Sequence, residues 1–271
     1  QITVLALSLL ITLAYSGLAW HFWRTRWRSL GPAHPREEQF ALMALLIGHG
    51  ALLIQGFTQS SVLGLSAGSA LSLTSWLSVA IFWSDSFYYR LDGIQPLLLP
   101  AAALATLAGA LTPTLHGFQG AELPAFRAHI MAAILSYSLL TIAALIAVLM
   151  SVADKRLHQH THNSLAANLP PLLGLESLLF KVLGAGFVLL TLTLASGILF
   201  SEEIFHKPFQ LNHKNLFTLI AWLVFALLLT GRQMLGWRGR TAVRWTLSGF
   251  SLLLLAYIGS KFVLEVLLHR Q

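Results

Sequence analysis

The sequence predicts an all-α, polytopic integral membrane protein with about eight transmembrane helices. Of the chain's 271 residues, 56% are hydrophobic and only 10% are charged. Its mean hydropathy is +0.72. A soluble domain carries roughly 25% charged residues, so this chain has too few polar side chains to cover a surface that faces water. The lipid bilayer is therefore its first predicted partner.

Eight long apolar runs predict the individual helices. They are approximately 2–23, 39–56, 62–84, 95–112, 129–152, 175–199, 215–231 and 245–268. A spanning helix needs about 20 apolar residues, so the second and fourth runs are near the lower limit. In the fourth run, Pro96 and Pro100 suit the first turn of a helix better than its middle. The first run lacks the basic segment and cleavage site of a signal peptide, so we interpret it as a spanning helix. No linker divides the runs, which predicts a single transmembrane domain over 1–271.

The positions of Lys and Arg predict that both termini lie on the outer face. Of the 17 basic residues, 12 follow the first, third, fifth and seventh runs or adjoin those loops. These are Arg24, Arg26, Arg28, Arg36, Arg90, Lys155, Arg156, Lys181, Arg232, Arg238, Arg240 and Arg244. The other five are Arg127, Lys207, Lys214, Lys261 and Arg270. Because inner loops carry the excess of Lys and Arg, the termini are expected in the periplasm of a bacterial inner-membrane protein.

The net charge of +7 does not indicate a nucleic-acid partner, because the basic residues lie in short loops between apolar runs. In the first loop, aromatic and basic residues alternate from Trp20 to Arg28. At a helix end this pattern predicts an interfacial aromatic belt with basic anchors.

No enzyme motif is visible in the chain. There is no cysteine, which excludes disulfides and thiolate metal sites. There is also no Gly-x-Ser-x-Gly, no paired metal motif and no phosphate-binding glycine loop. We therefore predict a protein without catalysis of its own.

Histidines at the predicted outer face are the main functional signal. They are His116, His129, His206, His213 and His269. His129 opens the fifth run, His213 precedes the seventh and His269 ends the eighth. Two histidines from different helices at one level could ligate a haem iron axially. Alternatively, they are ordinary interfacial residues at helix ends.

Two other groups of histidines leave alternatives open. His49 lies near the centre of the second run between Gly48 and Gly50, where either an interior hydrogen bond or a ligand role would account for it. His158, His160 and His162 lie in an inner loop; they could chelate a divalent ion, or the loop could simply be solvated.

The second half of the chain resembles the cytochrome c assembly membrane proteins of the CcsA and CcmC type. The stretch 175–230, which begins LESLLFKVLGAGF, is similar to the late core of that family. The continuation Gly236-Trp237-Arg238-Gly239-Arg240 fits as well, and so does His129 followed by Ser136-Tyr137-Ser138. The resemblance covers at least 95–271, and the eight-helix layout suits the short, YpjD- or HemX-like branch.

The resemblance implies a haem site at the outer face. In that family two histidines flank a tryptophan-rich loop, and by position they correspond to His129 and His269. His49 corresponds to a transmembrane histidine that holds haem deeper in larger members. The sequence departs from the family pattern in two places, because Ser201–Lys214 contains no tryptophan and Thr230 stands where a second transmembrane histidine is expected.

These observations predict a non-catalytic haem-binding or haem-handling protein, with His213 or His206 as an auxiliary residue. The alternative is an accessory or regulatory subunit that has lost the haem site and binds another membrane protein, such as a transporter. A membrane-protein partner or a homo-oligomer is expected in either case.

Overall fold

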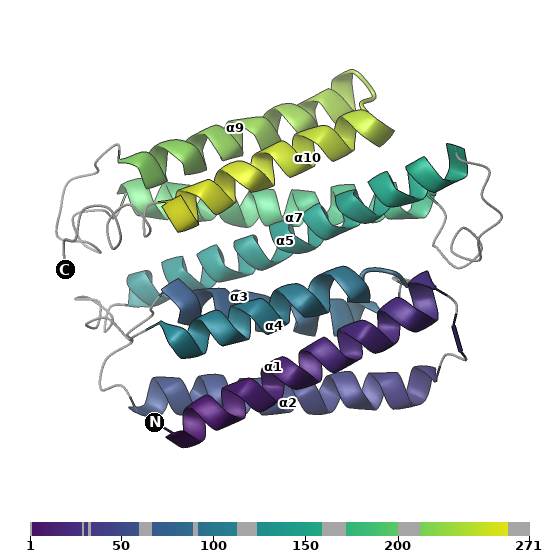
Figure 1. The fold of residues 1–271 in the computed structure, drawn as a ribbon. Coiled ribbons are helices and arrows are strands. Elements are labelled where there is room, and N and C mark those ends of the chain that lie inside the picture. Colours follow the sequence, from purple (N-terminus) through teal and green to yellow (C-terminus); the bar gives the residue numbers. More distant parts are fainter. Residues whose placement is uncertain are drawn as a thin grey trace. The chain divides into compact units, whose positions relative to one another are not determined.

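The computed structural model describes residues 2–28, 30–31, 34–59, 67–88, 92–112, 124–158, 172–199 and 212–259. Within these ranges every regular element is a helix and there is no strand (Figure 1). The helical segments long and apolar enough to cross a membrane are Val4–Trp27, Pro35–Gly56, Pro124–Lys155, Leu172–Leu199 and His213–Met234. The prediction of an all-α membrane protein is therefore confirmed.

The chain divides into two compact units. Unit 1 comprises Gln1–Phe118 and Val152–Leu175, and unit 2 comprises Gln119–Ser151 and Glu176–Gln271.

Unit 1 contains four complete α-helices among its described residues, besides the end of α5 (Pro124–His158) and the start of α7 (Leu172–Leu199). The four complete helices are α1 (Ile2–Phe22), which continues as the π-helical turn η1 (Trp23–Trp27), α2 (Pro35–Gln59), α3 (Ala67–Asp85) and α4 (Gln95–Leu111). Helix α4 packs along both α1 and α3. Small residues permit a close crossing of α3 and α4, because a Cβ atom built on Gly68 would lie only 2.3 Å from the carbonyl oxygen of Ala108. Such small-residue crossings are typical of membrane helices.

The two prolines of α4 differ in position. Pro96 lies in the first turn of the helix, as predicted, but Pro100 lies inside it. Pro100 is exposed on the helix surface, where the ring needs no space in the packed interior. The helix therefore continues through Pro100 to Leu111.

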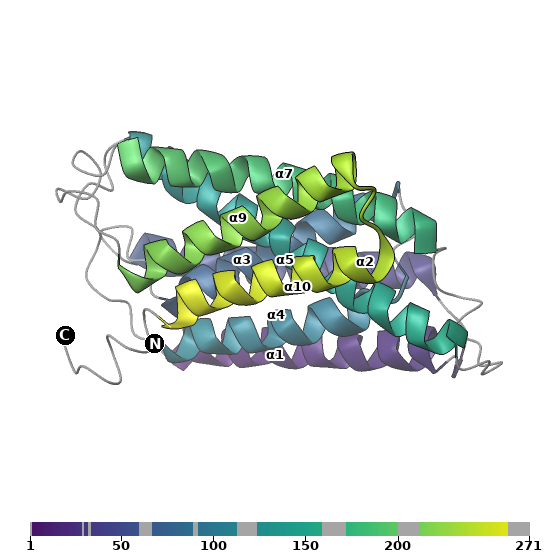
Figure 2. The same cartoon turned by 90° about the horizontal axis from the view of Figure 1, so that it is seen from above.

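Unit 2 contains most of α5 (Pro124–His158) and α7 (Leu172–Leu199), together with α9 (His213–Met234), α10 (Gly239–Leu254) and the π-helical turn η2 (Leu255–Gly259). In this unit the starts of α5 and α9 lie at the same end as the ends of α7 and α10 (Figures 1 and 2). Gly236 and Gly239 have positive φ angles of 66° and 53°, which form the tight turn between α9 and α10. This arrangement brings the start of α5 beside the end of α7, where the candidate site lies.

Candidate functional site

His129 is held at the end of unit 2 where α5 begins. Its ring is half-buried, and its Nδ1 lies 2.8 Å from Oγ of Ser196 in the last turn of α7. The ring also lies against Gly197, where an added Cβ atom would be 3.3 Å from Cε1 of His129. One turn before it along α5, Phe126 is buried and packs against Ile130. The ring is thus held between the hydroxyl of Ser196 and the backbone at Gly197.

The hydrogen bonds of Ser196 favour one tautomer of His129. Oγ of Ser196 lies 3.1 Å from the carbonyl oxygen of Thr193, to which it can donate its single hydrogen. When it does so, Oγ accepts from His129 and the hydrogen of the neutral ring is on Nδ1. Histidines that ligate metals commonly have such an arrangement, in which one ring nitrogen donates to a protein acceptor.

The start of α9 contributes further polar groups at this end of unit 2. Asn212 caps the helix, because its side-chain oxygen accepts from the backbone nitrogen of Asn215 at 2.9 Å. His213 adjoins Lys214 and is exposed. The structure therefore brings the predicted residues His129 and His213 to one end of unit 2.

Several predicted site residues lie outside the described part of the chain. These are His116, His160, His162, His206 and His269, as well as the side chain of His158 at the end of α5. Among the described residues, no group of three or more His, Cys, Asp or Glu side chains could hold a metal ion. Thr230 is exposed near the end of α9.

His49 has a different environment from His129. It is completely buried in unit 1, with 0% of its surface exposed. Its Nδ1 lies 3.0 Å from the hydroxyl of Tyr15, and its Nε2 lies 2.9 Å from Oγ of Ser72. The interior hydrogen bonds that the sequence left as one alternative are therefore present, and both ring nitrogens take part in them.

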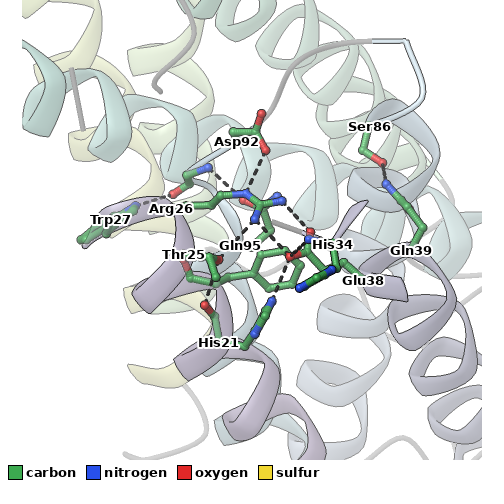
Figure 3. A network of polar contacts seen from close by, with 12 residues as sticks. His21, Thr25, Arg26, Trp27, His34, Glu38, Gln39, Ser86, Asp92 and Gln95 are labelled. Atoms are coloured by element: carbon green, nitrogen blue, oxygen red, sulfur yellow. Dashed lines mark hydrogen bonds and ion pairs between the residues drawn. The ribbon is translucent and has the colours of Figure 1, made fainter. Parts of the chain in front are cut away.

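A second polar cluster, which the sequence did not indicate, lies at the end of α1 in unit 1 (Figure 3). The guanidinium of Arg26 donates two hydrogen bonds to Glu38, with Nη2–Oε2 and Nη1–Oε1 distances of 2.5 and 3.1 Å. Nε of Arg26 also donates to Asp92 at 3.3 Å, and Nε2 of His21 lies 2.8 Å from Oε1 of Glu38. Glu38 is only 6% exposed, so this is a buried bidentate ion pair. We call these four residues the Arg26 cluster.

The Arg26 cluster revises the interpretation of the first basic loop. Arg24 and Arg28 are exposed, as expected for interfacial anchors. Arg26 instead lies in the π-helical turn η1 and pairs with α2 and with the segment before α4. Trp27 strengthens the same junction, because its Nε1 donates to the carbonyl oxygen of Gly93 at 3.1 Å. In this loop, the exposed Arg24 and Arg28 fit interfacial anchors. Arg26 and Trp27 instead connect η1 to α2 and to the segment before α4.

Unit 2 has a comparable carboxylate near the start of α7. Glu176 accepts from Nη1 of Arg232 at 2.8 Å and from the backbone nitrogen of Gly239 at 3.0 Å. Nε of Arg238 lies 3.6 Å from the same carboxylate. These contacts connect the start of α7 to the turn between α9 and α10.

Comparison with known proteins gives consistent results. The family model described as cytochrome C assembly protein matches residues 33–268, a stretch that begins earlier than the resemblance seen from 95 onward. One relative is a protein of Azospirillum brasilense named "Uncharacterized 28.8 kDa protein in nifR3-like 5'region". It is 32% identical to this chain over 210 residues, which cover 74% of this chain and 77% of the relative.

Two further relatives carry more informative names. The inner membrane protein YpjD of Escherichia coli strain K12 is 36% identical over 146 residues, which are 53% of this chain and 54% of the relative. The chain thus spans about half the length of the YpjD relatives that it matches. The cytochrome c biogenesis protein CcsA of a Synechocystis strain is 33% identical over 85 residues, which cover 31% of this chain and 25% of the relative. Together with the apolar helices, these matches identify a multi-pass protein of the inner membrane.

Proposed function

The chain belongs to the cytochrome c assembly protein family, and on that premise we propose that it is a haem-binding or haem-handling protein without catalysis of its own. The observation that carries the proposal is the orientation of His129. A half-buried imidazole whose Nδ1 contacts the hydroxyl of Ser196 has the hydrogen-bonded ring that metal-ligating histidines commonly show. A relative named as a cytochrome c biogenesis protein supports the same class of ligand.

The proposal includes a topology. We propose eight membrane spans in one functional domain, with both termini on the outer face. The five long apolar helices support most of these spans, and the shorter apolar helix Gln95–Leu111 supports another. The excess of Lys and Arg after the odd-numbered apolar runs supports the orientation. In this topology the start of α5, and with it His129, is at the outer face.

At the start of α5, His129 is the residue that would hold a haem. His129 would be the first ligand, and His269 would be the second by the family resemblance. His213 would be an auxiliary residue at the same end of unit 2. Bound haem would supply an iron that binds imidazole nitrogen. The chain's own contribution is to orient the His129 ring through Ser196, beside Gly197.

The absorption spectrum of the purified protein tests the proposed function. After expression with added haem and purification in detergent, the wild-type protein should show a Soret band and about one haem per chain. A colourless protein would contradict the proposal. If that colourless protein also retained a stoichiometric membrane-protein partner, the accessory-subunit alternative would be supported instead.

Replacing Ser196 with Ala should weaken haem binding without abolishing it. Outer hydrogen-bond partners of metal ligands typically contribute about 10–100-fold to affinity, and His129 would lose the acceptor that fixes its Nδ1–H tautomer. Titration of haemin into the haem-free protein measures this effect. Ser196→Thr keeps a hydroxyl and should bind nearly as well as wild type, whereas equal affinities for wild type and Ser196→Ala would refute the orienting role.

A further inference from the structure

A buried polar cluster joins the four complete α-helices described in unit 1. Each helix contributes one side chain: Tyr15 from α1, His49 from α2, Ser72 from α3 and Thr106 from α4. All four residues are at most 3% exposed. His49 is the central member, because every one of the three hydroxyl groups lies within hydrogen-bond distance of its ring.

The hydroxyl of Thr106 indicates the tautomer of His49. Its hydrogen is donated to the carbonyl oxygen of Ala102 at 2.8 Å, so Oγ1 can only accept from the imidazole. Oγ1 lies 3.5 Å from Nε2 of His49, and Oγ of Ser72 lies closer, at 2.9 Å. These contacts favour the tautomer with the ring hydrogen on Nε2, directed at Ser72 and Thr106.

This tautomer puts the lone pair of His49 on Nδ1. The hydroxyl of Tyr15 lies 3.0 Å from Nδ1 and donates its hydrogen there. The opposite tautomer would change only the direction of the hydrogen bonds, because both nitrogens would still have hydroxyl partners. A haem iron needs an imidazole lone pair, and His49 has already used its own. The donor set around His49 therefore does not fit a haem ligand.

We infer that His49 is the structural hub of unit 1 and that it does not ligate haem. The part of this inference that concerns haem rests on the proposed function. It implies that haem binds only at the outer end, with one haem per chain. Neutral imidazole suits a hub because it accepts at one side of a rigid ring and donates at the other. Inside a membrane, where apolar burial does not distinguish helix contacts from lipid contacts, such hydrogen bonds help to specify which helices associate.

Thermal unfolding and haem content, measured on the same detergent preparations, test the inference. Tyr15→Phe removes one hydroxyl and His49→Ala removes the hub. Each substitution should lower the unfolding temperature by about 2–8 °C, since it leaves a buried polar group without its partner. The double variant should lose less than the sum of the two shifts, because the residues act through one contact. Ser16→Ala is the control, since this exposed hydroxyl on α1 bonds only to its own helix at Thr12 and should leave the temperature unchanged.

Haem content distinguishes a structural role of His49 from a role as a haem ligand. The haem-to-protein ratio and the Soret position of Tyr15→Phe and His49→Ala should equal those of wild type. A halved ratio or a shifted band in His49→Ala would overturn the inference, as would additive or absent temperature shifts. If wild type binds no haem, the proposed function fails, but the unfolding temperatures still test whether His49 is the structural hub of unit 1. If His49→Ala cannot be purified, Tyr15→Phe paired with His49→Gln provides the same comparison.

Discussion

Replacing His129 with Ala should remove the Soret band from the purified protein. The substitution deletes the nitrogen proposed to bind the iron, and the neighbouring serine hydroxyl of Ser196 is not among the usual haem-iron ligands. Because losing an outer partner of a ligand already costs about 10–100-fold, losing the ligand itself should lower haem affinity by more than about 100-fold. Haem titration monitored by absorbance measures the change.

His213→Ala is the matched control for this experiment. His213 lies at the same end of unit 2 but is exposed, and its proposed role is auxiliary. Its replacement should leave most of the band in place. If His129→Ala kept a band equal to that of wild type, or if His213→Ala lost the band instead, the assignment of His129 would be wrong.

Replacing Glu38 with Ala should destabilise the protein strongly. Glu38 is buried and accepts two hydrogen bonds from Arg26 and one from His21. Removing one partner of a buried ion pair typically costs about 3–5 kcal/mol, because the remaining charge is left desolvated. Asp92 still accepts from Arg26 in this variant, so the expected loss is near the lower limit, about 3 kcal/mol. The free energy of unfolding in detergent measures it.

The neighbouring residue provides the control for Glu38. Glu37 belongs to the same first turn of α2 and is exposed. Glu37→Ala should change the free energy of unfolding by less than about 0.5 kcal/mol, as is usual for surface substitutions. Equal losses in the two variants would mean that the Arg26 cluster does not stabilise unit 1.

The apolar runs predicted where the helices lie but not where they end. The first run, 2–23, corresponds closely to α1, because hydrophobic residues fill that helix. Helix α2 begins at Pro35, before the run that starts at 39, because Glu37 and Glu38 are polar residues that favour a helix N-terminus. Helix α5 likewise extends beyond 129–152 at both ends. Hydropathy cannot register polar residues that continue a helix beyond the bilayer.

The sequence indicated a candidate ligand at His129 but not the contacts around it. The position of His129 at a helix start, together with the family resemblance, indicated a ligand. The partner that orients it, Ser196, is 67 residues away in the sequence, and no local pattern connects the two. The same holds for His49, whose partner Tyr15 is 34 residues away on another helix. Contacts between helices depend on how the helices pack, which a single sequence does not specify.

Chemical rescue of a His129→Gly variant tests most directly whether the protein binds haem through this residue. Glycine leaves the space of the missing ring beside Ser196 and Gly197. Free imidazole added to the haem-supplemented variant should therefore restore the wild-type absorption spectrum, and it should have no effect on wild type itself. A His129→Gly protein that shows the wild-type spectrum without imidazole, or that never recovers it with imidazole, would contradict the assignment.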